Sequence, residues 1–158
     1  MNWMPQLQIL GQVALAGLLG GIIGAEREWS GKPAGLRTQM FVAAAAALLV
    51  SLGPVIVQQI DVQGAARVRT DPIRIVEAVV TGISFIGAGS IIFVRGEHRL
   101  EGVTTAATVL LTMAVGIAVA LKQYVLAVSV TVLVVVVLWL MGKIDAVIHG
   151  RRSGKGEG

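Results

Sequence analysis

The segment LQILGQVALAGLLGGIIGA, residues 7–25, runs without a charged residue directly into the sequence EREWSGKPAGLRT of residues 26–38. An apolar run of about 20 residues is what one helix needs to cross the hydrocarbon core of a bilayer. The charged residues that follow then lie at the membrane surface, next to the end of that helix. We therefore expect a first candidate functional site at this surface.

The composition of the whole chain agrees with a membrane protein. Of 158 residues, 55% are hydrophobic and 14% are charged, and the mean hydropathy is +0.81, which is too apolar for a water-soluble domain. We predict an all-α, polytopic membrane helix bundle of about five transmembrane helices in residues 1–142, followed by a short, basic, disordered cytoplasmic tail in residues 143–158. The apolar stretches of spanning length begin near Leu7, Leu36, Ile73, Val103 and Val125.

The basic residues flank these stretches unevenly. Because Lys and Arg accumulate in cytoplasmic loops, we predict that the N-terminus lies outside and the C-terminus in the cytoplasm of a multi-pass protein of the cell (inner or plasma) membrane. Anchoring to membrane lipid explains the net charge of +4, so no nucleic acid is expected as a partner. The expected cytoplasmic side carries Arg27, Lys32, Arg37, Arg95, Arg99, Lys143, Arg151, Arg152 and Lys155, and the other side carries Arg67, Arg69, Arg74 and Lys122.

Small residues form a stripe on the first segment. Gly17, Gly21 and Gly24 recur at spacings of four and three, which places them on one face of a helix. Glycine lets helix backbones approach closely in lipid. We predict that this stripe packs against another helix of the same chain, and a homo-oligomer is the alternative.

The third and fourth segments carry most of the polar candidates inside the membrane. Asp71-Pro72 is a typical helix start. Glu77 lies where a carboxylate is costly unless it is paired, hydrated or protonated, with Arg74 as the obvious partner. Glu77 either takes part in transport or forms a local pair with Arg74 near the outer headgroups, where the cost is much lower. The glycines of residues 82–89 either break the helix beside a cavity or pack closely. The threonines of the fourth segment, which we expect to face the third, either line a path or bond to their own helix. This motif comprises Asp71, Arg74, Glu77, Thr81, Gly82, Ser84, Gly87, Gly89, Thr104, Thr105 and Thr108.

The charged residues after the first segment form the candidate site at the membrane surface. We expect an ion-pair lock at the inner membrane face that holds the first two helices in register and offers a docking surface; a solvated anchoring turn is the alternative. Acid–base catalysis by its carboxylates is disfavoured by the adjacent basic residues. We therefore predict no enzyme activity, no catalytic residue and no cofactor, and we assign no metal site. The motif comprises Glu26, Arg27, Glu28, Lys32, Arg37 and Thr38.

In their order and spacing, these motifs resemble the MgtC/SapB family. The resemblance covers all of the chain except its tail and rests on GAERE (24–28), PAGLRT (33–38), DPIR (71–74), TGISFIGAG (81–89) and GVTTAA (102–107). It implies a bacterial inner-membrane protein of about five spans, linked in some members to virulence and to growth at low magnesium. It also points to regulation of other membrane machines, among them the F-type ATP synthase and cation-transporting ATPases.

Two functions are compatible with these observations. The leading hypothesis is a non-enzymatic regulatory protein that acts by helix-to-helix contact on a larger transporter or ATPase, so that another membrane protein is the expected partner. The alternative is a small transporter for magnesium or another cation. In that case Asp71, Glu77, a glycine break and the threonines would form a path, because hard cations prefer oxygen ligands.

Overall fold

The computed structural model describes residues 3–62, 72–94 and 99–153 of the chain, and it contains five helices and one short hairpin within these ranges. All five expected helices are present, while the hairpin, in which Phe93 pairs with Leu100, was not expected. The elements are α1 (Met4–Trp29), α2 (Leu36–Val62), α3 (Pro72–Gly89), β1 (Ile92–Val94), β2 (Arg99–Glu101), α4 (Val103–Ala120) and α5 (Tyr124–Ser153).

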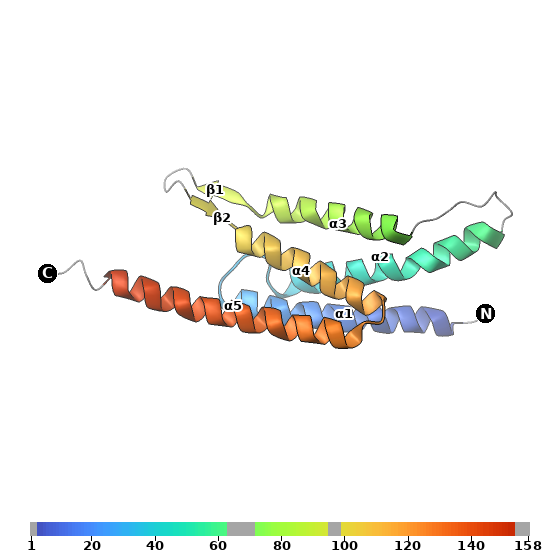
Figure 1. Ribbon diagram of the computed structural model, residues 1–158, viewed down its shortest axis with the longest axis horizontal. Helices are drawn as coiled ribbons and strands as arrows, with labels where there is room; N and C mark the ends of the chain where they lie inside the picture. Colours follow the sequence, from blue (N-terminus) through green and yellow to red (C-terminus); the bar gives the residue numbers. More distant parts are fainter. Residues whose placement is uncertain (1–2, 63–71, 95–98, 154–158) are drawn as a thin grey trace.

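Successive helices run in alternating directions, as Figure 1 shows. The α1–α2 connection, the β-hairpin and the end of α5 lie at one end of the bundle, which we call the hairpin end, and the start of α1 lies at the opposite end with the α4–α5 turn (Figure 1). This grouping agrees with the expected split of the helix flanks, and the orientation in the membrane stays a prediction. Among the described residues, four helices are long and apolar enough to cross a membrane: Met4–Trp29, Leu36–Gln58, Val103–Ala120 and Tyr124–Ile144.

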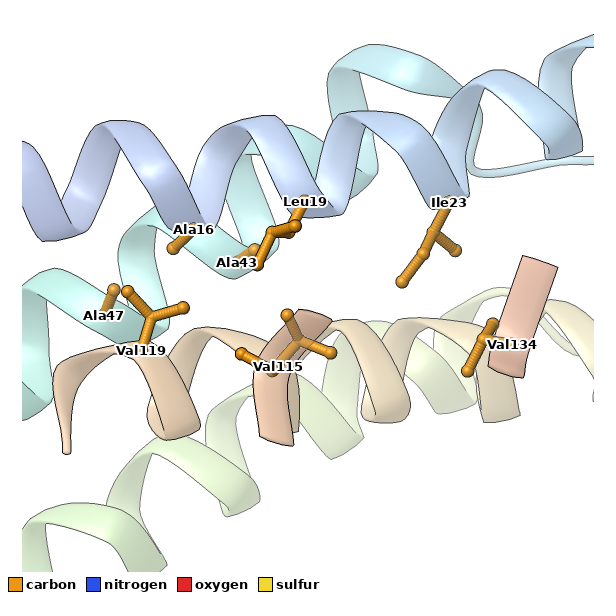
Figure 2. Close-up of a cluster of buried hydrophobic side chains, with 9 residues drawn as sticks. Ala16, Leu19, Ile23, Ala43, Ala47, Val115, Val119 and Val134 are labelled. Carbon is orange, nitrogen blue, oxygen red and sulfur yellow. The ribbon is translucent and has the colours of Figure 1, made fainter. Parts of the chain in front are cut away.

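The core lies where α1, α2, α4 and the first half of α5 meet (Figure 2). Its side chains are mostly alanine and valine, so the helices approach closely. A second cluster attaches α3 to the outside of α2 and α4 through Val79. The first cluster consists of Ala16, Leu19, Ile23, Ala43, Ala47, Val115, Val119, Ala127 and Val134.

Glycine makes the closest contacts of this core, which we call the seam and define by Gly20, Gly24 and Gly116. A Cβ atom at Gly20 would lie 2.5 Å from the carbonyl oxygen of Gln39, and one at Gly24 would lie 2.7 Å from the Cα of Leu36. A Cβ atom at Gly116 would collide with the carbonyl group of Ala43. The stripe formed by Gly17, Gly21 and Gly24 faces α2 throughout, as expected for packing within one chain.

Three helices are more continuous than their glycines, a proline or a charged tail would suggest from the sequence alone. Pro54 lies inside α2, which continues to Val62. The helix α3 is continuous through Gly82 and Gly87, so the helix break, one of the two alternatives for the glycines of residues 82–89, does not occur. Helices continue through such residues in apolar surroundings because an open backbone there would leave N–H and C=O groups without partners. The segment expected to be a disordered tail is helical as far as Ser153, because residues 143–149 contain neither glycine nor proline.

Candidate functional site

The end of α1 is a tight turn that leads the chain directly into α2. Lys32 N–H donates to the carbonyl of Arg27 at 2.9 Å, and Gly31 N–H donates to that of Glu28 at 3.1 Å. Gly31 adopts a positive φ of 63°, the conformation that glycine supplies most easily at a helix C-terminus. The turn therefore brings the charged residues at the end of α1 close to the start of α2.

Glu28 joins the two helices across this turn. Its Oε2 atom accepts a hydrogen bond of 2.9 Å from the backbone N–H of Leu36, the first residue of α2. A carboxylate in this position satisfies a free amide and interacts favourably with the helix dipole. Gly35 lies directly against the carboxylate, since a Cβ atom there would be 2.8 Å from Oε2. A side chain-to-backbone bond thus holds the register of α1 and α2.

The ion-pair lock that we expected is not formed within the part of the chain that the structure describes. Lys32, Arg37 and Thr38 are exposed, and no ion pair links them to Glu26 or Glu28 among the described residues. The basic side chains at the surface are free to extend into solvent or toward lipid headgroups, where a rigid pairing would cost side-chain entropy. Glu26 instead accepts a hydrogen bond of 2.7 Å from Ser30 Oγ through its Oε1 atom.

Arg27 points into the bundle. Only 4% of its surface is exposed, and its Nη2 atom donates to Thr105 Oγ1 of α4 at 3.2 Å. Two atoms of this region are buried without a hydrogen-bond partner in the structure, Nε of Arg27 and Oε2 of the adjacent Glu26. Enclosing a charge costs free energy unless it is paired and hydrogen-bonded. Arg27 therefore ties α1 to α4 at the hairpin end of the seam.

Gln39 adds a polar group that the sequence analysis did not single out. It is fully buried, its Nε2 atom donates to the carbonyl of Ala34 at 3.2 Å, and its Oε1 atom has no partner in the structure. The side chain packs against Gly24 of α1. The available signal is that Gln39 is the one amide within the apolar residues 39–50, because a polar side chain inside a membrane helix is costly without a role.

The threonines of α4 face the interior of the bundle. Thr105, Thr108 and Thr112 are buried, whereas Thr104 is exposed. Thr108 Oγ1 donates to the carbonyl of Thr104 at 2.6 Å, which is the bond to the own helix that we considered as an alternative. The Thr105 hydroxyl accepts its hydrogen bond from Arg27 of α1, whereas we had expected the hydroxyls of this segment to face the third helix. A helix surrounded on several sides can bury its hydroxyls against any neighbour.

The polar side chains of α3 point away from the other helices. Arg74, Glu77, Thr81 and Ser84 are all exposed and define what we call the outer face of α3. The opposite side of the helix contacts the bundle through Val79 and through Gly87, which packs against Ala106. In Figure 1, α3 forms the outermost layer of the molecule on its side.

The polar groups on the outer face of α3 differ in whether they have a hydrogen-bond or ion-pair partner. Thr81 and Ser84 donate to the carbonyls of Glu77 and Val80 at 2.8 and 2.7 Å. Within the described ranges, no ion pair joins Arg74 to Glu77. Gly82 and Gly89 would have no atom within 4 Å of an added Cβ, so neither serves packing in the described structure. Asp71 lies outside the described residues.

The candidate residues therefore form two separate groups. Arg27 and Thr105 belong to a buried cluster at the hairpin end, which Gln39 and Glu26 extend, while Arg74 and Glu77 lie on the outer face of α3. No group of three or more His, Asp or Glu side chains that could hold a metal ion occurs among the described residues. The fold and these groups define a multi-pass helical membrane protein with one polar cluster inside and one polar face outside.

Comparison with known proteins identifies the family. The model of the MgtC family matches residues 13–147, and the chain belongs to this family. It is 38% identical over 127 residues to a protein of Escherichia coli (strain K12) named "Putative magnesium transporter YhiD", covering 80% of this chain and 57% of that protein. It is 38% identical over 117 residues to Protein MgtC of Brucella abortus (strain 2308), with 74% and 44% covered.

A further relative is Protein MgtC of Salmonella typhimurium, which is 33% identical over 117 residues, with 74% of this chain and 45% of that protein covered. The chain thus spans between 44% and 57% of the length of these three relatives. No solved structure matches the chain.

Proposed function

We propose that this chain is a non-enzymatic regulator that binds a larger membrane transporter or ATPase through the outer face of α3. The observation that carries the proposal is the exposure of Arg74 and Glu77 on the side of α3 that faces away from the bundle. A charged side chain at membrane depth is rare and costly unless a partner or a hydrated cavity receives it. A second membrane protein would supply such a partner.

Glu77 is the group on this face with the greatest need for a partner. It follows Pro72 by five residues, which is about 7.5 Å along the axis at 1.5 Å per residue. Arg74 lies in the first turn, from which a long side chain reaches the headgroup layer. The hydroxyls of Thr81 and Ser84 are already bonded to their own helix. The proposed partner helix therefore presents a hydrogen-bond donor or a cation at the depth of Glu77.

The arrangement supports this function better than a transport path through one copy of the chain. The alternative requires Glu77, a glycine break and the threonines of α4 to line a common route. In the structure Glu77 faces outward, α3 is continuous, and Thr105 contacts α1. Because the Escherichia coli relative is named "Putative magnesium transporter YhiD", transport is the alternative function against which we test the proposal.

Site-specific photocrosslinking in cells grown at low magnesium tests the proposed contact. We place the crosslinking residue at Ser84 on the outer face of α3, and at Val132 of α5, which is 57% exposed, as the matched control on a lipid-facing helix. The proposal expects a product from position 84 that contains a subunit of a transporter or an ATPase, which Glu77→Leu removes. Products of the same kind from position 132, or none from position 84, contradict it.

A flux assay in proteoliposomes separates the two functions. The purified chain alone is expected to move no magnesium, sodium or protons, because its polar groups do not line one route. Uptake of any of these ions that Glu77→Gln abolishes would overturn the regulatory proposal and establish transport. Correct insertion is checked by protease accessibility before flux is measured.

A further inference from the structure

The first half of α1 and the α4–α5 turn lie at the end of the bundle opposite the hairpin (Figure 1). A cavity of about 380 Å³ opens between them. Its volume falls in the range of small-ligand pockets, about 300–1,000 Å³. Neither the buried cluster around Arg27 nor the outer face of α3 contributes to it. The lining residues are Gln8, Gly11, Gln12, Leu15, Lys122 and Tyr124.

The α4–α5 turn holds Lys122 at this cavity in a defined conformation. Lys122 has a φ of 60°, a left-handed conformation that is unfavourable for a residue with a Cβ atom. Two hydrogen bonds close the turn, from Lys122 N–H to Val119 and from Gln123 N–H to Ala118, at 2.9 and 2.8 Å. Glycine would adopt this backbone more easily, so the lysine occupies this position at a conformational cost.

Gln12 fixes the opposite wall. Its Oε1 atom accepts a hydrogen bond of 3.0 Å from Ser51 Oγ of α2, and its Nε2 atom donates to the carbonyl of Ala120 in α4 at 3.4 Å. One amide thus joins three helices beside the cavity. Gln8 lies one helical turn away on the same face of α1, so the wall is polar at two successive levels.

The lining chemistry is that of an anion site. It offers one ammonium group, one phenol and two amides, and none of its six residues is Asp or Glu. Lysine binds phosphate as a point charge, and tyrosine typically lies at the headgroup level of a bilayer. Apolar residues of α1 next to the cavity, Leu7 and Leu10, are 59% and 62% exposed and offer a surface for acyl chains.

We propose that this cavity binds the phosphate group of a membrane phospholipid, with Lys122 as the cationic contact and Tyr124 and the two glutamines as further hydrogen-bonding groups. The position at the helix ends, beside exposed apolar residues of α1, favours a lipid over a soluble phosphate. This inference is independent of the proposed regulatory function, because it involves the other end of the bundle and none of the residues of α3.

Native mass spectrometry of the full chain in detergent micelles tests this site. We titrate phosphatidylglycerol against the wild type and Lys122→Gln, and use Lys143→Gln as the matched control. Lys143 lies in the second half of α5, toward the hairpin end, where its Nζ stacks on the ring of Trp139 at 3.8 Å. Lys122→Gln is expected to weaken lipid binding about fivefold, as for the loss of one basic contact to an anionic headgroup, while Lys143→Gln leaves it unchanged.

Two further comparisons test whether the ligand is a lipid rather than free phosphate, and whether it binds at this cavity. Inorganic phosphate, added at the same concentrations without lipid, is expected not to bind, and a Lys122-dependent adduct with phosphate but not with phosphatidylglycerol overturns the assignment to a lipid. Equal weakening by Lys122→Gln and Lys143→Gln indicates attraction by net charge and overturns the site itself. Tyr124→Phe, which keeps the ring and removes the hydroxyl, is expected to weaken binding less than Lys122→Gln, and thermal unfolding confirms that each variant is folded.

Discussion

Glycine and threonine occur both where α1, α2 and α4 pack together and on α3, but their surroundings differ completely. At Gly20 and Gly116 an added Cβ would meet the backbone of α2, whereas at Gly82 it would meet nothing within 4 Å. Thr105 is buried and accepts a hydrogen bond from Arg27, whereas Thr81 is exposed and bonds to its own helix. The same residue types therefore form close contacts between helices in one region and an exposed surface without such contacts in the other.

The largest expected effect comes from disturbing the helix packing at the seam. Gly116→Ala forces a methyl group into the Ala43 carbonyl, and we expect a loss of about 1–3 kcal/mol in the free energy of unfolding, as for overpacked cores. Gly82→Ala is the matched control, since the same methyl group enters open space and alanine favours a helix. Denaturant unfolding in detergent measures both. Equal losses in the two variants would remove the distinction between the regions.

An effect of similar size is expected at the buried hydrogen bond between α1 and α4. Thr105→Val keeps the shape of the side chain but leaves the Arg27 guanidinium without its acceptor, which is expected to cost about 1–3 kcal/mol. Thr104→Val, one residue earlier and exposed, is expected to change stability by less than about 0.5 kcal/mol. A neutral Thr105→Val would mean that Arg27 finds another acceptor. Thermal unfolding of the two variants side by side decides this.

A smaller effect is expected at the surface end of the seam. Glu28→Ala removes the acceptor of the Leu36 N–H, and we expect a loss of about 0.5–1.5 kcal/mol, because water can replace part of an exposed hydrogen bond. Glu101→Ala, an exposed carboxylate in the hairpin, provides the control and should be neutral. Hydrogen exchange at the first turn of α2 should increase in the Glu28 variant only.

The smallest effect on stability is expected on the outer face of α3. Glu77→Gln and Thr81→Ala should each change the free energy of unfolding by less than about 0.5 kcal/mol, as for surface positions. Under the proposed function, Glu77→Gln nevertheless weakens the crosslink from position 84 to the partner. A large loss of stability in this variant would show that the face is part of the fold rather than a contact surface.

Much of the fold could be predicted from the sequence, because helices in a membrane need long apolar runs and these are easily recognised. The glycine stripe on α1 also packs against another helix of the chain, as expected, and this helix is α2. The direction of the polar face of α3 could not be predicted. In a soluble protein a polar face points to water, but in a bilayer both the bundle interior and the surroundings are apolar, so periodicity alone does not tell inside from outside.

The contact between Arg27 and Thr105 could not be predicted for a different reason. The two residues are 78 positions apart in the chain, and each belongs to a motif that has a sufficient local explanation, a charged anchoring turn and a threonine bonded to its own helix. Their meeting depends on which helices become neighbours. Gln39 was missed because a single amide belongs to no spaced motif, and its isolation in an apolar segment was the one available signal. In the structure it is fully buried.

Pro54 affects the part of α2 that lies against α3. A proline inside a helix cannot donate to the carbonyl four residues before it, so α2 lacks one backbone bond at the level of Val50. The adjacent Gly53 is the point where α2 touches Ile75 of α3. We expect faster amide exchange just after Pro54 than in the first turns of α2, and slower exchange there in Pro54→Ala. In these terms α3 has one compliant contact, at Ile75, and firmer contacts with α2 and α4 at Val79 and Gly87.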